Sequence, residues 1–298
     1  MSKEKPVPKG FQENAPRISE FRRFLKVFLG RGLVVFGLII ILALLFTALT
    51  ADLIATYDPY DQDLRSSLAQ PNSKHWLGTD ALGRDTLSRV IYGTRTSLMV
   101  GFIAIGIGAT IGMLLGLLAG YYRGWVYVII MRFMDSLIAF PLIILALVLA
   151  ALLGGGLKNV MIAIGVGLTP AYARLMCGVV LSIRETDYVL AGRSMGASNL
   201  RIMLGHVLPN SFPPLIVLIT MMLGTTILAE AGLSFLGIGI DPPGAAWGAM
   251  VSDGYRYLLT NPILSFAPGI AIILVVFAFN MVGDGLRDAL DPRLRGTL

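Results

Sequence analysis

Six long stretches of the chain carry almost no charged residue, and this feature limits the possible folds more than any other. Five of them are free of charge throughout, and the fourth in chain order contains one arginine, Arg174. A helix needs about 20 apolar residues to cross the hydrocarbon core of a bilayer, so each stretch is long enough to span a membrane. The sequence therefore predicts an all-α membrane protein with six transmembrane helices, over residues 32–51, 96–122, 136–157, 159–183, 207–229 and 257–283.

The composition excludes the common soluble classes. Of the 298 residues, 55% are hydrophobic and only 14% are charged, although the net charge is +6. A soluble domain usually has about 25% charged residues, so this chain lacks the polar surface for a soluble enzyme, a disordered protein or a nucleic-acid binder. The single cysteine, Cys177, excludes a disulfide framework, and His75 and His206 are too far apart for metal-ligand spacing.

The first apolar stretch has two interpretations, a membrane anchor or a cleaved signal peptide. It is longer than the apolar region of 7–15 residues in a signal peptide and follows about 30 mostly polar residues, which favours an uncleaved anchor. The small residues around Ala48 and Thr50 form an acceptable cleavage site, so cleavage stays open as the alternative.

The basic residues orient the spans. With six spans both termini lie on one side, and that side carries 17 of the 24 lysines and arginines. Short loops rich in lysine and arginine stay in the cytoplasm, so we expect both termini to be cytoplasmic. The expected organisation is a cytoplasmic N-terminal tail at 1–31, a first transmembrane helix at 32–51, an extracytoplasmic segment at 52–95, a core domain of five transmembrane helices at 96–285 with a cytoplasmic loop at 185–209, and a cytoplasmic tail at 286–298.

Two smaller predictions concern the ends of these segments. Residues 1–16, with three prolines and mixed charge, have the composition of a mobile tail. The outer sequence Asp241-Pro242-Pro243-Gly244 cannot be helical, because proline lacks a backbone donor and restricts the residue before it.

The second span carries a glycine at every fourth position, which places the glycines on one helix face. They are Gly108, Gly112, Gly116 and Gly120. Small residues let helix backbones approach closely in a membrane, so this face is expected to pack on another helix. Static close packing and a sliding surface are both compatible with the pattern, and static packing is the simpler interpretation.

Four charged residues lie in or near the predicted spans. Arg132, Asp135 and Arg174 fall towards cytoplasmic ends, where long side chains reach the interface, and Arg132 and Asp135 have the i, i+3 spacing of a pair on one helix. Glu230, towards the outer end of the fifth span, is the best candidate for a residue of a translocation pathway, with a structural role as the alternative. The sequence contains no chain of buried acids to support a proton relay.

The cytoplasmic loop at 185–209 predicts two short helices. Thr186 or Asp187 can cap the first, Gly196 stands where a left-handed stop is expected, and Ser198 can cap a second helix that ends before Pro209. Helical spacing places four apolar or small residues of the first helix on one stripe, namely Tyr188, Ala191, Gly192 and Met195. Such a stripe fits a lever inserted into the groove of another protein, or a loop lying on lipid headgroups.

This loop resembles the coupling-loop signature of ABC-importer permeases. That signature runs Glu-Ala-Ala, three residues, Gly, nine residues, Ile, any residue and Leu-Pro, and it aligns here on Gly196 and on Leu208-Pro209. Leu190-Ala191-Gly192 stands at the Glu-Ala-Ala positions and His206 at the Ile. The glutamate is absent, so the resemblance implies docking to an ATPase without a charge-specific contact. The implied docking residues are Tyr188, Ala191, Gly192, Met195, Gly196, Ala197, Leu200 and Pro209.

Other stretches are similar to one subgroup of these permeases, the second (C-type) subunit of dipeptide, oligopeptide and nickel importers. They are His75–Asp85 followed by Leu87–Gly93, Leu233–Gly239, Pro242-Pro243 with Trp247-Gly248, and Phe279–Pro292. The similarity covers about residues 20–295. It implies the type I ABC-importer permease fold, in the cytoplasmic (inner) membrane of a prokaryote.

The resemblance also implies the partners and the mechanism. A homologous permease would complete a heterodimer, two cytoplasmic ABC ATPases would bind the coupling loops, an extracytoplasmic binding protein would deliver the cargo, and membrane lipid would surround the spans. Peptides are the expected cargo, with nickel chelates or glutathione as alternatives. The chain itself would be no enzyme and bind no cofactor or nucleic acid, with ATP bound by the partner subunits; it contains no Gly-x-x-x-x-Gly-Lys-Ser/Thr phosphate loop.

Two other classes of function stay open from the residues alone. An ion-coupled secondary transporter uses broken helices and midplane sites, but buried charges are few here and no repeat is visible. A membrane scaffold without a pore would need neither the coupling spacing nor a cargo.

Overall fold

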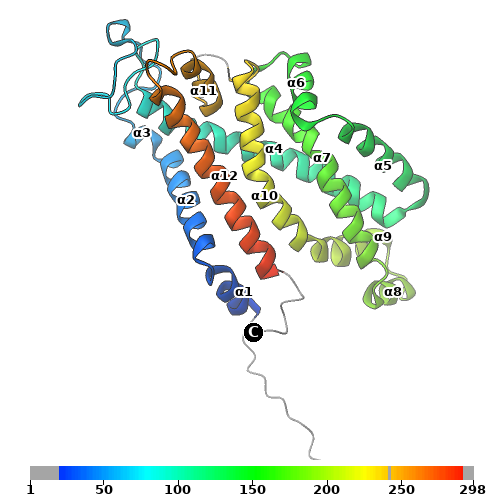
Figure 1. Ribbon diagram of the computed structural model, residues 1–298. Coiled ribbons are helices and arrows are strands. Elements are labelled where there is room, and N and C mark those ends of the chain that lie inside the picture. Colours follow the sequence, from blue (N-terminus) through cyan, green and yellow to red (C-terminus); the bar gives the residue numbers. More distant parts are fainter. Residues whose placement is uncertain (1–19, 241–242, 291–298) are drawn as a thin grey trace, which may run out of the picture.

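The computed structural model describes residues 20–240 and 243–290, and these residues form a helical membrane bundle (Figure 1). The described part contains one isolated bridge, between Thr79 and Asp85, and no strand. The helices are α1 (Glu20–Leu29), α2 (Gly32–Leu49), α3 (Ala51–Ile54), α4 (Thr86–Tyr122), α5 (Gly124–Ile138), α6 (Leu142–Leu152), α7 (Gly156–Ile183), α8 (Asp187–Ser194), α9 (Asn199–Ile202), α10 (Leu208–Phe235), α11 (Trp247–Tyr255) and α12 (Ile263–Leu290), with a 3₁₀ turn at Leu64–Ser66 and a π turn at Met203–Val207.

The membrane-crossing helices confirm the predicted all-α membrane fold. Five helical segments are long and apolar enough to cross a bilayer, namely Gly32–Leu49, Thr86–Tyr122, Gly156–Ile183, Asn199–Phe235 and Ile263–Leu290. The bent pair α5 and α6 supplies the remaining span, which is the third in chain order. Each of these segments consists mainly of apolar residues, whose transfer from water into hydrocarbon is favourable. The bilayer, and not a large soluble core, therefore accounts for the apolar composition.

The third span differs from the single straight helix predicted at 136–157. The structure has α5 and α6 on either side of a short break, and their axes are bent by 93°. Pro141 is the residue before α6 and has no backbone N–H group, and a proline also disfavours helical geometry at the residue before it, Phe140. The helix that the sequence placed from Ser136 therefore begins at Gly124 and turns sharply at Pro141.

Two other boundaries also differ from the prediction. Helix α4 begins at Thr86, ten residues before the expected start of the second span, and Asp85 caps it by accepting a hydrogen bond from the Ser88 N–H (2.8 Å). Helix α12 continues to Leu290, past the expected core boundary at residue 285. The predicted tail at 1–16, the last residues of the predicted C-terminal tail, and Asp241 and Pro242 lie outside the described residues.

The centre of the bundle is the crossing of α4 on α7, and the glycine stripe of the second span makes it possible. A Cβ atom at Gly108 would lie 2.7 Å from the Gly165 carbonyl oxygen, and one at Gly120 would lie 2.9 Å from that of Cys177. Contacts this short leave no room for a side chain, so the two backbones touch along the stripe. The glycine face thus packs on another helix, as predicted.

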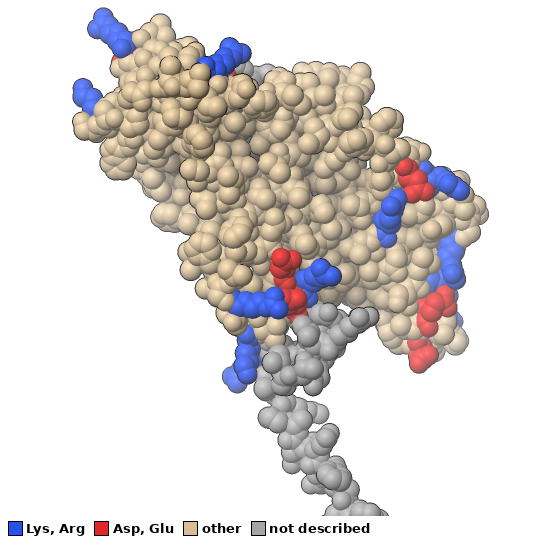
Figure 2. Space-filling model, viewed as in Figure 1, with Lys and Arg blue, Asp and Glu red and all other residues tan. Residues whose placement is uncertain are grey.

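The ends of the bundle differ in content. Figure 1 shows α1, the end of α12 and α8–α9 at the lower end, and α3, α11 and the loops around residues 55–85 at the upper end. The first and last described helices therefore reach the same side as the loop 185–209, which agrees with two cytoplasmic termini. Figure 2 shows Lys, Arg, Asp and Glu side chains of this face near the two ends and along the edge where α5 lies, with an uncharged surface over the rest of the middle.

Candidate functional site

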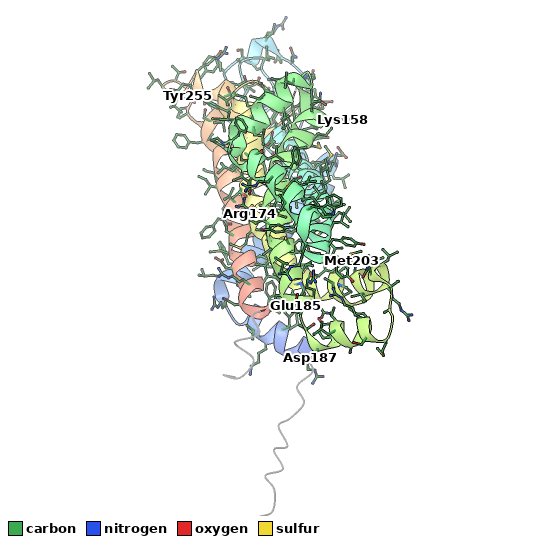
Figure 3. The ribbon with its side chains drawn as sticks, turned by 90° about the vertical axis from the view of Figure 1, so that its right-hand side faces the viewer. Lys158, Arg174, Glu185, Asp187, Met203 and Tyr255 are labelled. Carbon is green, nitrogen blue, oxygen red and sulfur yellow. The ribbon has the colours of Figure 1, made fainter. Side chains whose placement is uncertain are left out.

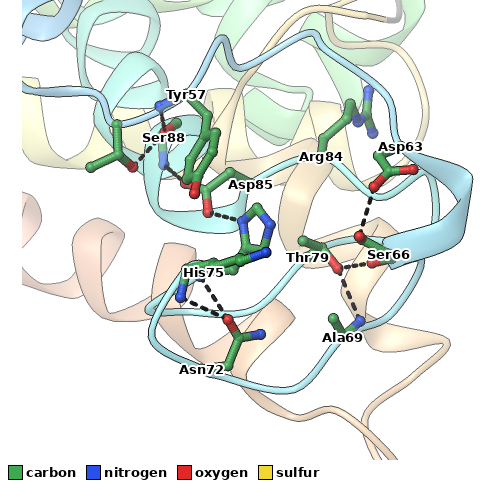
Figure 4. A network of polar contacts seen from close by, with 12 residues as sticks. Tyr57, Asp63, Ser66, Ala69, Asn72, His75, Thr79, Arg84, Asp85 and Ser88 are labelled. Atoms are coloured by element: carbon green, nitrogen blue, oxygen red, sulfur yellow. Dashed lines mark hydrogen bonds and ion pairs between the residues drawn. The ribbon is translucent and has the colours of Figure 1, made fainter.

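The outer end carries a network of polar side chains that fixes the start of α4 (Figure 4). His75 Nδ1 lies 2.9 Å from Asp85 Oδ1, and the other oxygen of this carboxylate caps α4. The Ser88 hydroxyl accepts a hydrogen bond from the Tyr57 N–H at 3.1 Å. The loop before α4 is thereby attached to the helix through side chains of which Asp85 and Ser88 are buried.

Arg89 ties this loop to a segment that is distant in the sequence. Its guanidinium donates hydrogen bonds to the carbonyl oxygens of Pro59, Pro243 and Gly244 at 3.0–3.3 Å. Its Nε lies 3.6 Å from Asp80 Oδ2, and the Arg89 residue is only 3% exposed. A buried charge persists only when it is paired and hydrogen-bonded, and here both conditions are met within the chain.

We name the outer cap the described residues 55–92 and 243–262, which these contacts join. Trp247, fully buried, donates from Nε1 to the Val90 carbonyl at 2.9 Å, and Gln70 donates to the Thr260 carbonyl at 3.0 Å. On the surface of the cap, the Ser66 hydroxyl and the Arg65 N–H hold the pKa of Asp63 below its usual value. Two of the stretches that carry the family resemblance, the one before and at the start of α4 and the one around Trp247, thus pack against each other in the outer cap.

The cytoplasmic end carries α8 and α9, and local signals explain the first of them. Thr186 stands at the N-cap position of α8, but its hydroxyl donates to the Ile183 carbonyl (2.6 Å) instead of capping the helix. Gly196 follows α8 with φ +81°, which is the predicted left-handed stop. Ser198 caps α9 by accepting from the Arg201 N–H at 3.4 Å, also as predicted.

The second cytoplasmic helix does not end before Pro209, contrary to the prediction. From Asn199 the helix runs through the π turn Met203–Val207 and continues as α10 to Phe235. A π turn has wider backbone hydrogen bonding than an α-helix, which accommodates a following proline that has no N–H group to donate. The loop 185–209 is therefore continuous with the fifth span.

The apolar stripe of α8 is exposed except at one position. Tyr188 is 46% and Met195 is 81% exposed, and Ala191 is exposed as well, whereas Gly192 is buried. Leu200 on α9 is 62% exposed, Pro209 is exposed and Ala197 is half-buried. Val189, outside the predicted stripe, is fully buried and packs α8 against the bundle.

Tyr121, at the end of α4, connects α8 and α9 to the membrane helices. Its hydroxyl donates to Asn199 Oδ1 at 2.9 Å, and the Arg193 guanidinium lies 5.2 Å from the centre of its ring. The Arg184 side chain, at the end of α7, donates a hydrogen bond to the backbone carbonyl oxygen of Tyr121. We call Tyr121, Arg184, Arg193 and Asn199 the Tyr121 joint. In sequence Tyr121 is only the last part of an apolar run, so spacing could not reveal it.

Comparison with known proteins places the chain. Residues 112–296 match the family described as the binding-protein-dependent transport system inner membrane component, and residues 19–71 match the N-terminal transmembrane domain of oligopeptide transport permease C. The chain belongs to this transport family. It is a C-type permease of an ABC importer and an integral component of a bacterial inner membrane.

Relatives and solved structures agree with this assignment. The permease is 41% identical to the dipeptide transport system permease protein DppC of Alkalihalophilus pseudofirmus, over 93% of this chain and 91% of the relative. It is 42% identical to the glutathione transport system permease protein GsiD of Pectobacterium atrosepticum, over 92% of each chain. A chain of the MetNI methionine ABC transporter shares its fold with a TM-score of 0.57 and 22% identity, over 69% of this chain and 97% of the other.

The possible pair of Arg132 and Asp135, predicted near a cytoplasmic end, is replaced by a contact between helices. Asp135 on α5 pairs with Arg174 on α7 at 2.8 Å, and not with Arg132 on its own helix. Figure 3 shows Arg174 well inside the length of the permease, between Lys158 at the outer end of α7 and Glu185 at the cytoplasmic end. Inserting a lone arginine at the centre of a lipid-facing helix costs about 2.5–3.5 kcal/mol of free energy, so an arginine inside a span is a candidate functional residue.

Glu230, the predicted pathway residue, is enclosed in the permease. It is 1% exposed, and its Oε1 accepts a hydrogen bond from the Ser234 hydroxyl at 2.7 Å. Its Oε2 has no hydrogen-bond partner among the described residues. A contact between Glu230 and the cargo stays a prediction, and in this structure the side chain packs inside the bundle.

Proposed function

We propose that this permease forms, with a homologous permease, the passage of an ATP-driven importer for peptides, and that α8 and α9 receive the movement of a cytoplasmic ATPase. The observation that carries the proposal is the exposed apolar surface of α8 and α9 on a firm attachment to α4 and α7. The resemblance of the loop 185–209 to coupling loops supports the same assignment.

The side chains of α8 and α9 fit a protein groove better than water. Leu190, Met195, Leu200 and Leu204 are each between 42% and 81% exposed. Large exposed apolar patches on a soluble surface mark interaction sites, and a helix laid in a groove is a common way to cover them. The predicted docking residues Tyr188, Ala191, Gly192, Met195, Gly196, Ala197, Leu200 and Pro209 lie on or beside this surface.

The Tyr121 joint supports transmission of movement into the membrane. The Tyr121 side chain contacts α8 through Arg193 and α9 through Asn199, and its backbone carbonyl accepts a hydrogen bond from Arg184 at the end of α7. The end of α4 and the helices α8 and α9 therefore move together. When ATP draws two ATPases together, their grooves would pull α8 and α9, and the spans would tilt to open the passage outwards; hydrolysis would reverse the tilt and release the cargo inwards.

Peptide cargo is supported by the relatives, since one is named for dipeptides and the other for glutathione, itself a peptide. A binding protein would deliver the peptide to the outer cap, where large apolar side chains are exposed, namely Leu64, Trp76, Tyr255 and Leu259. Neither task needs a cofactor on this chain, and ATP would be bound by the partner ATPases.

The test joins docking to transport. The permease is purified with its partner chains, and cysteines placed at Tyr188→Cys or Met195→Cys are crosslinked to the ATPase with and without ATP. We expect crosslinks that change with ATP, while the outer control Trp76→Cys gives none to the ATPase. Vesicles holding the full complex should then take up radiolabelled dialanine with ATP inside. Uptake driven by a sodium or proton gradient without ATPases would refute the proposal.

A further inference from the structure

The ion pair of Asp135 and Arg174 lies at the depth of the membrane interior. Arg174 is nine residues before the cytoplasmic end of α7, which is about 14 Å along a helix. Asp135 is eleven residues after the cytoplasmic start of α5, or about 17 Å. These are lengths along the helix axes, and on both helices they place the pair inside the span, nearer the cytoplasmic end of α7 than its outer end.

The pair faces outwards from the permease and is not enclosed by it. The side chains of Asp135 and Arg174 are 51% and 56% exposed. Figure 2 shows acidic and basic side chains together on the edge where α5 lies, away from both ends. An ion pair at this depth is unfavourable against lipid tails, so the surface around it faces water or another protein.

The neighbouring surface of α7 differs from a lipid-facing helix. Helical spacing places Gly178 and Ser182 on the face of Arg174, and both are exposed. On α2, by contrast, the exposed positions at membrane depth are large and apolar, such as Ile39 and Leu42 at 58% and 57%. From Arg174 towards the cytoplasm the α7 face is thus small, with Gly178 and then the polar Ser182 one residue before the helix ends, whereas the α2 face is bulky and apolar; a small face beside the pair fits a water-filled passage.

The local charge favours an anion. Arg132 is exposed one turn before Asp135 on the same helix, so two guanidinium groups accompany one carboxylate. A guanidinium binds a carboxylate through two parallel hydrogen bonds, and every peptide with a free C-terminus carries this group. We propose that Arg174, held by Asp135 while the passage is empty, binds the carboxylate of the peptide as it crosses the membrane. The inference rests on the proposed function.

Accessibility tests the location. In the assembled transporter with Cys177→Ala, Arg174→Cys should react with a charged, membrane-impermeant thiol reagent, and dialanine with its binding protein should slow the reaction. Ile39→Cys is the lipid-facing control and should stay unreactive. Equal reactivity of Arg174→Cys and Ile39→Cys would overturn the proposal, because the pair would then lie outside the passage.

Transport tests the role of the charge. Vesicles with the full complex are assayed for dialanine uptake and for ATP hydrolysis stimulated by the binding protein. Arg174→Gln should lower uptake about 10- to 100-fold while hydrolysis continues, the loss expected for hydrogen bonds to a charged group. Arg174→Lys keeps the charge and should lose less. Lys158→Gln, at the outer end of the same helix, is the control and should transport normally.

A neutral pair separates a cargo contact from a structural bond. Asp135→Asn combined with Arg174→Gln keeps hydrogen-bonding side chains but removes both charges, so a purely structural pair would leave uptake intact, and that result would overturn the inference. Loss of uptake with intact hydrolysis supports it. If the unaltered complex imports neither dialanine nor glutathione, the proposed function fails instead, which is a distinct result.

Discussion

The two ends of the permease differ in how their polar and apolar groups are satisfied. At the outer cap the Arg89 guanidinium is 3% exposed and has its hydrogen-bond acceptors within the chain. At the cytoplasmic end the opposite holds for apolar groups, because Met195 is 81% and Leu200 is 62% exposed. The comparison teaches that the buried charge of the outer cap has its partners within one chain, whereas the function proposed for α8 and α9 depends on apolar side chains that a partner would cover.

The largest effect expected is on the outer cap. Arg89→Ala removes one member of a buried pair and leaves three carbonyl oxygens without their donor, so the free energy of unfolding should fall by about 3 kcal/mol. Thermal unfolding in detergent measures the loss. Arg65→Ala, an exposed arginine of the same segment, is the control; an equal effect of both changes would mean that the cap does not depend on its buried arginine.

A smaller effect is expected at Gly196, and on coupling more than on folding. Valine there must adopt φ near +81°, which costs about 1–2 kcal/mol, although its Cβ would meet no atom within 4 Å. Gly196→Val should therefore alter the end of α8 and lower dialanine uptake about tenfold while ATP hydrolysis and the melting temperature change little.

Gly106→Val is the matched control for this change. Gly106 lies on an exposed face of α4, where a Cβ also meets no atom within 4 Å, and its backbone is helical. The Gly106→Val permease should import dialanine normally. Unimpaired uptake by Gly196→Val would contradict the role of α8 as the receiving element.

The hydroxyl of Tyr121 sharpens the comparison further. Tyr121→Phe removes the hydrogen bond to Asn199 but keeps the ring beneath Arg193, a loss of about 0.5–1.5 kcal/mol. The ratio of dialanine imported to ATP hydrolysed should fall about 2- to 10-fold. Tyr122→Phe, at the neighbouring position, should leave the ratio unchanged. Equal ratios for both variants would exclude a coupling role for the Tyr121 hydroxyl.

The smallest effect concerns a charge on the surface of the outer cap. The pKa of Asp63 is lowered by the Ser66 hydroxyl first and then by the Arg65 N–H, so its ionised form stabilises the turn above the usual pKa of 3.8, and this stabilisation is lost as the pH falls through the lowered value. Asp63→Asn should speed proteolysis of residues 60–70 slightly at pH 7, and the difference should shrink as the pH falls below 3.8. A difference that stays constant as the pH falls would contradict this.

Local patterns predicted much of the fold and of helices α8 and α9. Charge-free stretches located the spans, and Gly196 and Ser198 marked the end of α8 and the start of α9. Pro141 also carried a local signal, but its consequence was missed, because a proline in an apolar run is compatible with a kink or with a break. The 93° bend depends on how α5 and α6 pack on α7, which spacing does not reveal.

Contacts between distant residues were not predictable from spacing. Asp135 had a possible partner three residues away, Arg132, yet it pairs with Arg174, 39 residues further along. Arg89 and Tyr121 likewise act through partners from other helices and loops. The position of Glu230 in the sequence did not show that its side chain is enclosed in the bundle. Its role as a pathway residue stays a prediction.

Helix α4 gives the permease a single span from one side of the membrane to the other. Its 37 residues run from the Asp85 cap to the Tyr121 joint, a length of about 55 Å. With α7 seated against its glycines, the helix behaves as a stiff rod. A tilt of about 5° around its midpoint moves each end by about 2.4 Å in opposite directions. In the proposed transporter, a binding protein on the outer surface and an ATPase on the cytoplasmic surface would act on the two ends of one rigid helix, so that a movement imposed at one end would be transmitted to the other.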